Sequence, residues 1–191
     1  MIMLKIETRK KYFKALGLGE YNHESILSLQ KKYFSDPDEH DGEYGPKTDI
    51  LLRHVYNVMK YTKNFSPEEF KCGCGGRFCT GYPDYLKKNE ALHIQHVRDY
   101  NGGPVKITSG LRCRQFNTIL KGSSKNSGHL TGRAVDFYAA NKGGNLRDRK
   151  KLIEHIKHYD NHIWSYCNGW SSARTTPYAP NMGQAIHTET K

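Results

Sequence analysis

An aspartate in the middle of an apolar strand pattern is the feature that most restricts how this chain can fold. Residues 133–139 read Arg-Ala-Val-Asp-Phe-Tyr-Ala, a short run that favours a β-strand. In a strand, Asp136 points to the same side as Ala134 and Tyr138 and away from Val135 and Phe137. A carboxylate in this setting is costly to bury unless a partner compensates its charge. The rest of the sequence must therefore supply that partner.

A metal cation shared with histidines would compensate the charge of Asp136. His129 lies in the preceding loop, whose glycines let the backbone fold back over the strand. His187 lies in a late apolar strand pattern, within residues 184–190. Two histidines and one carboxylate, with one coordination position left open, form the ligand set of a catalytic zinc site. The spacing of His129 and Asp136 taken alone favours a simpler alternative, a hydrogen bond between the two side chains.

The N-terminal residues have the pattern of a three-helix unit. Helices are expected over residues 8–18 and 22–34, and a third helix is expected to be capped by Thr48. The run from Leu29 to Thr48 contains Asp-Gly-Glu-Tyr-Gly-Pro-Lys-Thr and resembles peptidoglycan-binding modules over about residues 8–60. The alternative is an ordinary helical bundle in which these residues only make a turn.

The remainder of the chain mixes strand and helix patterns. Strands are expected over residues 104–112, 133–139, 162–166 and 184–190, and a helix over 145–159. This mixture predicts an α+β fold. A polar stretch near residue 62 separates the two parts, so we expect two domains, residues 1–62 and 63–191.

A longer motif surrounds Asp136. It reads Ser127-x-His129-x-x-Gly132-x-Ala134-x-Asp136, preceded by Ser109-Gly110-Leu111-Arg112 and followed by Ile186-His187-x-Glu189. Over about residues 63–191 this arrangement resembles peptidase family M15, the zinc D-Ala-D-Ala carboxypeptidases and L-alanyl-D-glutamate endopeptidases of bacteria and phage lysins. The resemblance implies the fold shared by hedgehog domains and D-Ala-D-Ala peptidases, with a central antiparallel sheet.

The same resemblance implies roles for individual residues. Carried over by position, His129, Asp136 and His187 bind zinc. Arg112 binds the substrate or stabilises the developing oxyanion, for which a planar guanidinium is well suited, and Ser127 contributes to substrate binding.

The general base departs from one pattern of the family. Several members carry Asp or Glu three residues before the last histidine, where this chain has Gln184, which cannot accept a proton. Other members have His-x-Asp, which His187-Thr188-Glu189 resembles. On a strand Glu189 shares a face with His187, so we expect it to act as the base. Its alternatives are a contact that orients the metal ligands, or a surface position near the C-terminus.

The cysteines and the remaining histidines leave further alternatives. Cys72, Cys74 and Cys79 could form a structural zinc site with Cys113 or with neighbours of His129, although Cys-x-Cys spacing is unusual for zinc knuckles. They could also form a disulfide with Cys113, or be a family feature without either role. Two further sets of histidines are spaced along expected helices: His93 with His96, and His155 with His158 and His162. Neither set has the nearby carboxylate and loop found around Asp136. We expect the second set to lie on a solvated face.

Charge limits the range of partners. Lys and Arg number 30 against 19 Asp and Glu, a net charge of +11, which favours a polyanionic partner. No long basic run or RNA-binding aromatic signature occurs, so we expect anionic wall polymers rather than nucleic acid. No apolar run approaches the ~18–20 residues of a membrane span, and residues 1–11 lack the pattern of a secretory signal. These features suggest a monomeric phage or prophage lysin, made in the bacterial cytoplasm and released to the wall.

Together, these patterns predict a zinc metallopeptidase that hydrolyses the peptide stems of bacterial peptidoglycan, as an endolysin or a D,D-carboxypeptidase. The alternative is a zinc domain that binds the cell wall without cleaving it. Gln184 is the residue that keeps this alternative open.

Overall fold

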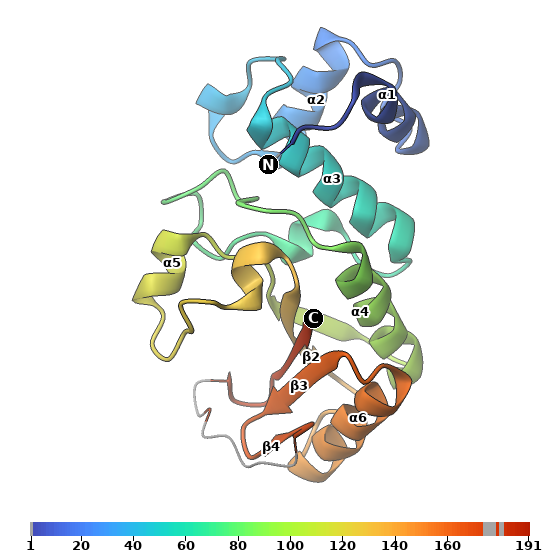
Figure 1. The fold of residues 1–191 in the computed structure, drawn as a ribbon, viewed down its shortest axis with the longest axis vertical. Coiled ribbons are helices and arrows are strands. Elements are labelled where there is room, and N and C mark those ends of the chain that lie inside the picture. The colour runs from blue at the N-terminus through green and yellow to red at the C-terminus, as the bar shows by residue number, and fades with distance from the viewer. Residues whose placement is uncertain (1, 174–178, 180–181) are drawn as a thin grey trace.

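Three helices form the N-terminal part of the molecule (Figure 1). The computed structural model describes residues 2–173, 179 and 182–191. The helices are α1 (Ile6–Ala15), α2 (His23–Tyr33) and α3 (Pro46–Tyr61). Helix α2 begins after Asn22, whose side chain accepts a hydrogen bond from the Ser25 amide at 2.9 Å. The three-helix arrangement was correctly predicted.

The start of α3 differs from the prediction. Gly45 is its N-cap residue and Pro46 lies in its first turn, so Thr48 is inside the helix. The hydroxyl of Thr48 is buried and accepts a hydrogen bond from the Gln30 amide at 3.1 Å. Thr48 therefore joins two helices and does not cap one.

The Asp-Gly-x-Tyr-Gly-Pro loop is held by Gln30, which is 1% exposed. The Gln30 amide nitrogen donates to Asp41 Oδ1 at 2.8 Å, and its carbonyl oxygen accepts from the Gly42 amide at 2.7 Å. Gly42 has a φ of 71° and packs so closely on His23 that a Cβ would lie 2.3 Å from the imidazole. Internal hydrogen bonding thus explains why these residue types occur in the loop.

A five-stranded sheet follows the helices, with strand order β1-β2-β5-β3-β4 and antiparallel pairing throughout the described residues. The α+β fold with a central antiparallel sheet is therefore confirmed. The strands are β1 (Val105–Ser109), β2 (Ala134–Ala139), β3 (Ile163–Cys167), β4 (Trp170–Ser171) and β5 (Ile186–Thr190). Helices α4 (Lys88–Asn101) and α6 (Leu146–Tyr159) pack against the sheet (Figure 1).

The two faces of the sheet differ because side chains alternate along a strand. One face carries apolar residues that pack with α4 and α6, among them Ile107, Val135, Phe137, Ile163 and Ile186. The opposite face carries polar and aromatic residues that line a cleft, among them Asp136, Tyr138, Tyr166, His187 and Glu189. One face of the sheet therefore forms the core and the other is available for chemistry.

Helix α3 contributes to both halves of the molecule. Its N-terminal residues Leu51 and Leu52 pack with the other N-terminal helices, while Val58 lies in the core beneath the sheet. Buried His54 contacts the Pro67 carbonyl through Nε2 and accepts from the Leu86 amide through Nδ1. Burial lowers the pKa of His54 to about 4, so its ring is neutral near pH 7. A neutral imidazole thus joins α3 to the segments that precede α4.

The connections contain short elements that the sequence patterns did not reveal. They are the 3-10 turns η1 (Pro37–Glu39), η2 (Pro67–Phe70) and η3 (Gly128–Thr131) and the helix α5 (Arg114–Ile119). In the described part of the chain, no helix has the length and apolar character needed to cross a bilayer.

Gly132 ends η3 and brings the chain to β2, and its replacement tests this close packing. Its φ is 65°, and a Cβ would lie 1.9 Å from the Tyr85 carbonyl oxygen. We expect Gly132→Ala to destabilise the protein by more than the roughly 1–2 kcal/mol that the left-handed conformation costs. Gly102, with a φ of 63° and no atom within 4 Å of a Cβ, provides the control. Urea unfolding should show a larger loss for Gly132→Ala than for Gly102→Ala, and equal losses would contradict the expectation.

Candidate metal centre

The polar face of the sheet forms the floor of an open cleft of about 1220 Å³. Its walls come from the segment after β1, from α5 and from the loop that leads to η3. Every site residue predicted from the sequence lines this cleft: Arg112, Ser127, His129, Asp136, His187 and Glu189. The fold thus collects side chains from positions 112 to 189 in one place.

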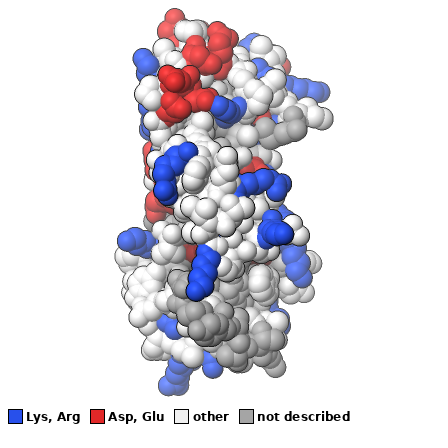
Figure 2. Space-filling model, turned by 90° about the vertical axis from the view of Figure 1, so that its left-hand side faces the viewer, with Lys and Arg blue, Asp and Glu red and all other residues white. Residues whose placement is uncertain are grey.

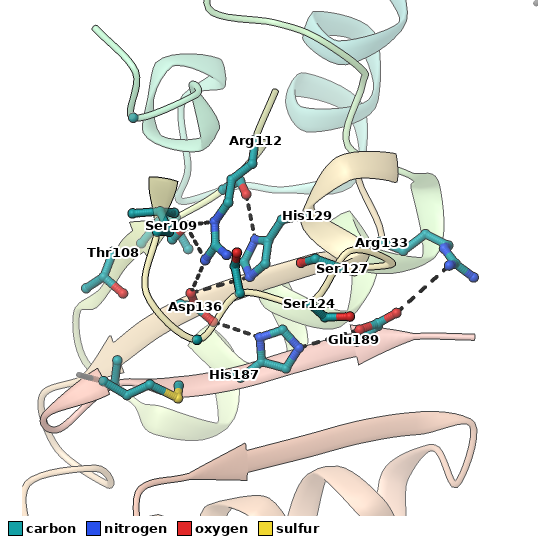
Figure 3. Close-up of a pocket in the computed structure, with 18 of the residues that line it drawn as sticks. Thr108, Ser109, Arg112, Ser124, Ser127, His129, Arg133, Asp136, His187 and Glu189 are labelled. Atoms are coloured by element: carbon teal, nitrogen blue, oxygen red, sulfur yellow. Dashed lines mark hydrogen bonds and ion pairs between the residues drawn. The ribbon is translucent and has the colours of Figure 1, made fainter. Parts of the chain in front are cut away.

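The three predicted metal ligands lie side by side (Figure 3). Asp136 on β2 is directly opposite His187 on β5, and His187 Nδ1 is 2.8 Å from Asp136 Oδ1. His129 Nε2 is 3.3 Å from the other carboxylate oxygen, Oδ2. The three ligand atoms lie within 4.8 Å of one another, close enough to share one ion.

The orientation of His129 is determined by a backbone carbonyl. Its Nδ1 is 2.7 Å from the Gly110 oxygen, and since that oxygen can only accept, Nδ1 must carry the proton. Burial lowers the pKa of His129, which favours the neutral ring. The Nε2 lone pair is then buried, has no hydrogen-bond partner among the described residues, and faces the Asp136 carboxylate.

A cation fits between these two acceptors. A lone pair facing a carboxylate oxygen cannot form a hydrogen bond with it, so a shared proton does not explain the arrangement. A metal ion would fit there, because it accepts electron pairs from both groups. The donor set of two imidazoles and one carboxylate is typical of zinc, and the Nδ1–H···O=C contact of His129 is the kind of support that metal-binding histidines usually have.

His187 contacts a carboxylate on each side. Burial alone would lower its pKa, but Asp136 at Nδ1 and Glu189, 3.6 Å from Nε2, raise it above the ordinary value. Burial alone would raise the pKa of Asp136, but its contacts with His129 and His187 hold it below the usual range. Asp136 is therefore an anion throughout the neutral range, as a metal ligand must be.

Glu189 lies at the edge of the ligand group. It shares the face of β5 with His187, as predicted, and its Oε1 is 3.9 Å from Arg133. Contact with His187 lowers its pKa despite partial burial, so it is ionised near pH 7. A Cβ on Gly128 would lie 2.5 Å from the Glu189 carboxyl carbon, so glycine at position 128 makes room for the carboxylate.

Arg112 lies on the other side of Asp136. Its guanidinium donates to Asp136 Oδ2 at 2.8 Å and to the Ser109 hydroxyl at 2.9 and 3.0 Å. The Arg112 amide also donates to the His129 carbonyl at 3.0 Å. Arg112 is thus held against the ligand group and faces the cleft.

The matching region includes much of this site. Residues 63–164 match the family model for Peptidase M15. The chain belongs to the Peptidase M15 family. His129 and Asp136 lie within the match, whereas His187 and Glu189 lie beyond it and reach the site through β5. No curated protein and no solved structure matches the chain.

Membership in Peptidase M15 makes this chain a peptidase, and its residues provide a candidate metal site.

The sequence patterns did not identify Tyr166 and Trp164 as site residues, although their rings lie 4.6 and 5.7 Å from the His187 ring. Their alternation in the Ile-Trp-Ser-Tyr run was the available signal, because it places both on the face opposite Ile163.

The helix histidines take no part in either group of described residues that could hold a metal. His158 and His162 are exposed, as expected for a solvated face, and half-buried His155 contacts His96. His93 is instead buried and contacts the Thr188 hydroxyl at 2.8 Å.

Proposed function

We propose that this Peptidase M15 member is a zinc metallopeptidase that hydrolyses the peptide stems of bacterial peptidoglycan. The observation that carries the proposal is the unpartnered, buried Nε2 of His129, which faces Asp136 beside His187 in an open cleft. His129, Asp136 and His187 would hold the ion. Zinc bound there would supply a Lewis acid and lower the pKa of water towards ~7.

The residues around the ligands have complementary roles in the proposed hydrolysis. Glu189 is ionised and lies beside the ligands, so it can accept the proton of the attacking water and return it to the leaving amine. Arg112 carries a positive charge to the other side of the site, where it can bind a substrate carboxylate or stabilise a developing oxyanion. Ser127 lines the cleft between these groups and can donate to the peptide backbone.

The charge of the cleft favours an acidic peptide. Apart from Arg112, its lining includes Lys71, Lys121, Arg133 and Lys191, against the acids Glu69, Asp136 and Glu189. Stem peptides carry free carboxylates, which these cations would attract.

The positive charge of the whole chain belongs mainly to the part that holds the cleft. Residues 1–62 contain 10 Lys and Arg against 9 Asp and Glu, and residues 63–191 contain 20 against 10. On the face of the molecule drawn in Figure 2, most of the acidic side chains gather at the N-terminal end. In our proposal, attraction to anionic wall polymers therefore acts through the catalytic part, and the N-terminal helices bind peptidoglycan without a strong net charge.

Digestion of purified peptidoglycan tests the proposed function. The wild-type protein with zinc should release free amino groups, and mass spectrometry of the products should identify either a D-Ala-D-Ala or an L-Ala-D-Glu bond as the one cut. If protein shown to contain zinc releases no new amino groups from peptidoglycan, the proposal that this peptidase acts on peptidoglycan is contradicted. Binding to walls without cleavage would instead support the non-catalytic alternative, which Gln184, an exposed residue that lines the cleft, keeps open.

Metal affinity should depend on pH through His187. In the metal-free protein the pKa of His187 is raised, so its ring stays protonated up to a higher pH than the ring of an ordinary histidine. Zinc must displace a proton from His187 Nδ1, so binding should weaken as pH falls through this pKa. The folding stability of the metal-free protein changes with pH in the opposite direction. Because the pKa of His187 is raised on folding, its protonation stabilises the folded state at low pH, and this contribution is lost as pH rises through that pKa.

The rise in melting temperature caused by zinc should therefore shrink between about pH 8 and pH 5.5. Differential scanning calorimetry with and without zinc measures this rise directly. A constant zinc-induced shift over that range would contradict the assignment of His187 as a ligand.

A further inference from the structure

Four of the five cysteines meet in one cluster, which shares no residue with the ligands of the candidate catalytic site. Their sulfur atoms all lie within 4.8 Å of one another; they belong to Cys72, Cys74, Cys79 and Cys113. Cys72, Cys74 and Cys113 are buried, Cys79 is half-buried, and all four are free thiols. The proposed peptidase function uses none of them.

The geometry points to a second, structural metal site in which these four thiolates bind one zinc ion. Zinc bound by four cysteines is tetrahedral with Zn–S distances near 2.3 Å, which separates neighbouring sulfurs by roughly 3.8 Å. The Cys74 and Cys79 sulfurs are 3.5 Å apart, and no pair of the four sulfurs is separated by more than 4.8 Å. Two disulfides would need the sulfurs to be close only in pairs, whereas a metal needs every sulfur near every other, as observed.

The backbone around the cluster favours thiolates. The Cys113 amide donates to Cys72 Sγ and the Phe116 amide donates to Cys113 Sγ, each at 3.4 Å. Amide hydrogen bonds of this kind stabilise negative charge on sulfur, and zinc binding requires deprotonated cysteines. Four thiols would release their protons on binding Zn²⁺, which leaves a net charge of −2 on the site.

The spacing between Cys74 and Cys79 fits a zinc site better than the Cys-x-Cys spacing of Cys72 and Cys74 does. Cys74 and Cys79 have four residues between them, within the usual range for a zinc-binding pair. The chain turns between them at Gly75 and Gly76, with φ values of 65° and 84°. These glycines adopt a conformation that other residues rarely adopt, and so allow both sulfurs to approach one ion.

The cluster joins two segments that build the wall of the catalytic cleft. Cys113 directly follows Arg112, and the Leu111 amide donates to the Phe70 carbonyl at 2.8 Å, close to Cys72 in the chain. Phe116, which packs against the cluster, also lines the cleft. A zinc ion here would therefore fix the segment that positions Arg112, without touching the substrate.

Metal and thiol analysis of the purified protein tests this inference directly. The wild-type chain should contain two zinc ions, and mass spectrometry after unfolding and alkylation without reductant should find all five cysteines as thiols. Cobalt substitution should produce the thiolate-to-cobalt charge-transfer absorption. A disulfide among the four cysteines, or zinc that leaves all four open to alkylation in the folded protein, would overturn the inference.

Variants separate this site from the catalytic one. Cys74→Ala/Cys79→Ala should lose one zinc and the charge-transfer band, and its melting temperature should fall by more than about 5 °C. Cys167→Ala is the matched control because Cys167 is a buried thiol outside the cluster, and it should keep both ions. Asp136→Asn should keep the cysteine-bound zinc and its band. If the double variant is insoluble, the wild-type metal content and thiol count still decide the matter.

Discussion

Asp136→Asn is expected to abolish hydrolysis and to weaken metal binding at the cleft by more than about 100-fold, a larger loss than removal of a residue that only orients a ligand. The change preserves the shape of the side chain but removes the anion that faces both His129 and His187. It also leaves Arg112 without its carboxylate partner at 2.8 Å, so two imidazoles and a guanidinium would surround a neutral amide. Zinc titration by calorimetry and digestion of peptidoglycan measure the two effects.

Two helix histidines provide the control for Asp136→Asn. His155→Ala and His158→Ala should change neither zinc content nor rate, because neither residue belongs to a group of described residues that could hold a metal. The zinc ascribed to the cysteine cluster should also remain in Asp136→Asn. Unchanged affinity for the cleft metal in that variant, or loss of that metal on substitution of either histidine, would mean that the ligands are wrongly assigned.

Glu189→Gln is expected to reduce the hydrolysis rate by about 10²–10⁴-fold, the usual contribution of a general base, while the cleft still binds zinc. Glutamine has nearly the shape of glutamate and keeps an oxygen beside His187 Nε2, which lies 3.6 Å from the present carboxylate, so the orientation of that ring should survive. Glutamine cannot accept the proton of the attacking water. Rates should be compared at saturating zinc, with metal content measured on the same samples.

The outcome for Glu189→Gln distinguishes between the two roles that its position allows. If Glu189 only orients His187, the variant should keep most of its activity and lose at most about 10–100-fold in metal affinity. Gln184→Ala is the control, because Gln184 lines the cleft but has no proton-accepting group. A large rate loss in Gln184→Ala together with a small one in Glu189→Gln would contradict the proposed base.

The sequence alone determined the elements that local patterns specify. The alternation around Asp136 predicted both the strand and the face on which its carboxylate lies, and the register of β2 with β5 agrees with it. The Asn22 cap and the apolar spacing of α2 predicted that helix closely. A carboxylate in an apolar strand also indicated a cation, because the cost of burying the charge does not depend on the details of the fold.

Tertiary structure alone decided the distances and orientations of groups that lie far apart in the sequence. The family match ends at residue 164, yet β5 pairs with β2 and places His187 opposite Asp136. The Gly110 carbonyl determines the tautomer of His129, and the Gln30 amide takes up the hydroxyl of Thr48; no local pattern predicts either contact. The four cysteines are spread over residues 72–113, and spacing could not choose between their alternatives. The distances between their sulfur atoms depend on how two loops pack together, and the fold brings all four within 4.8 Å.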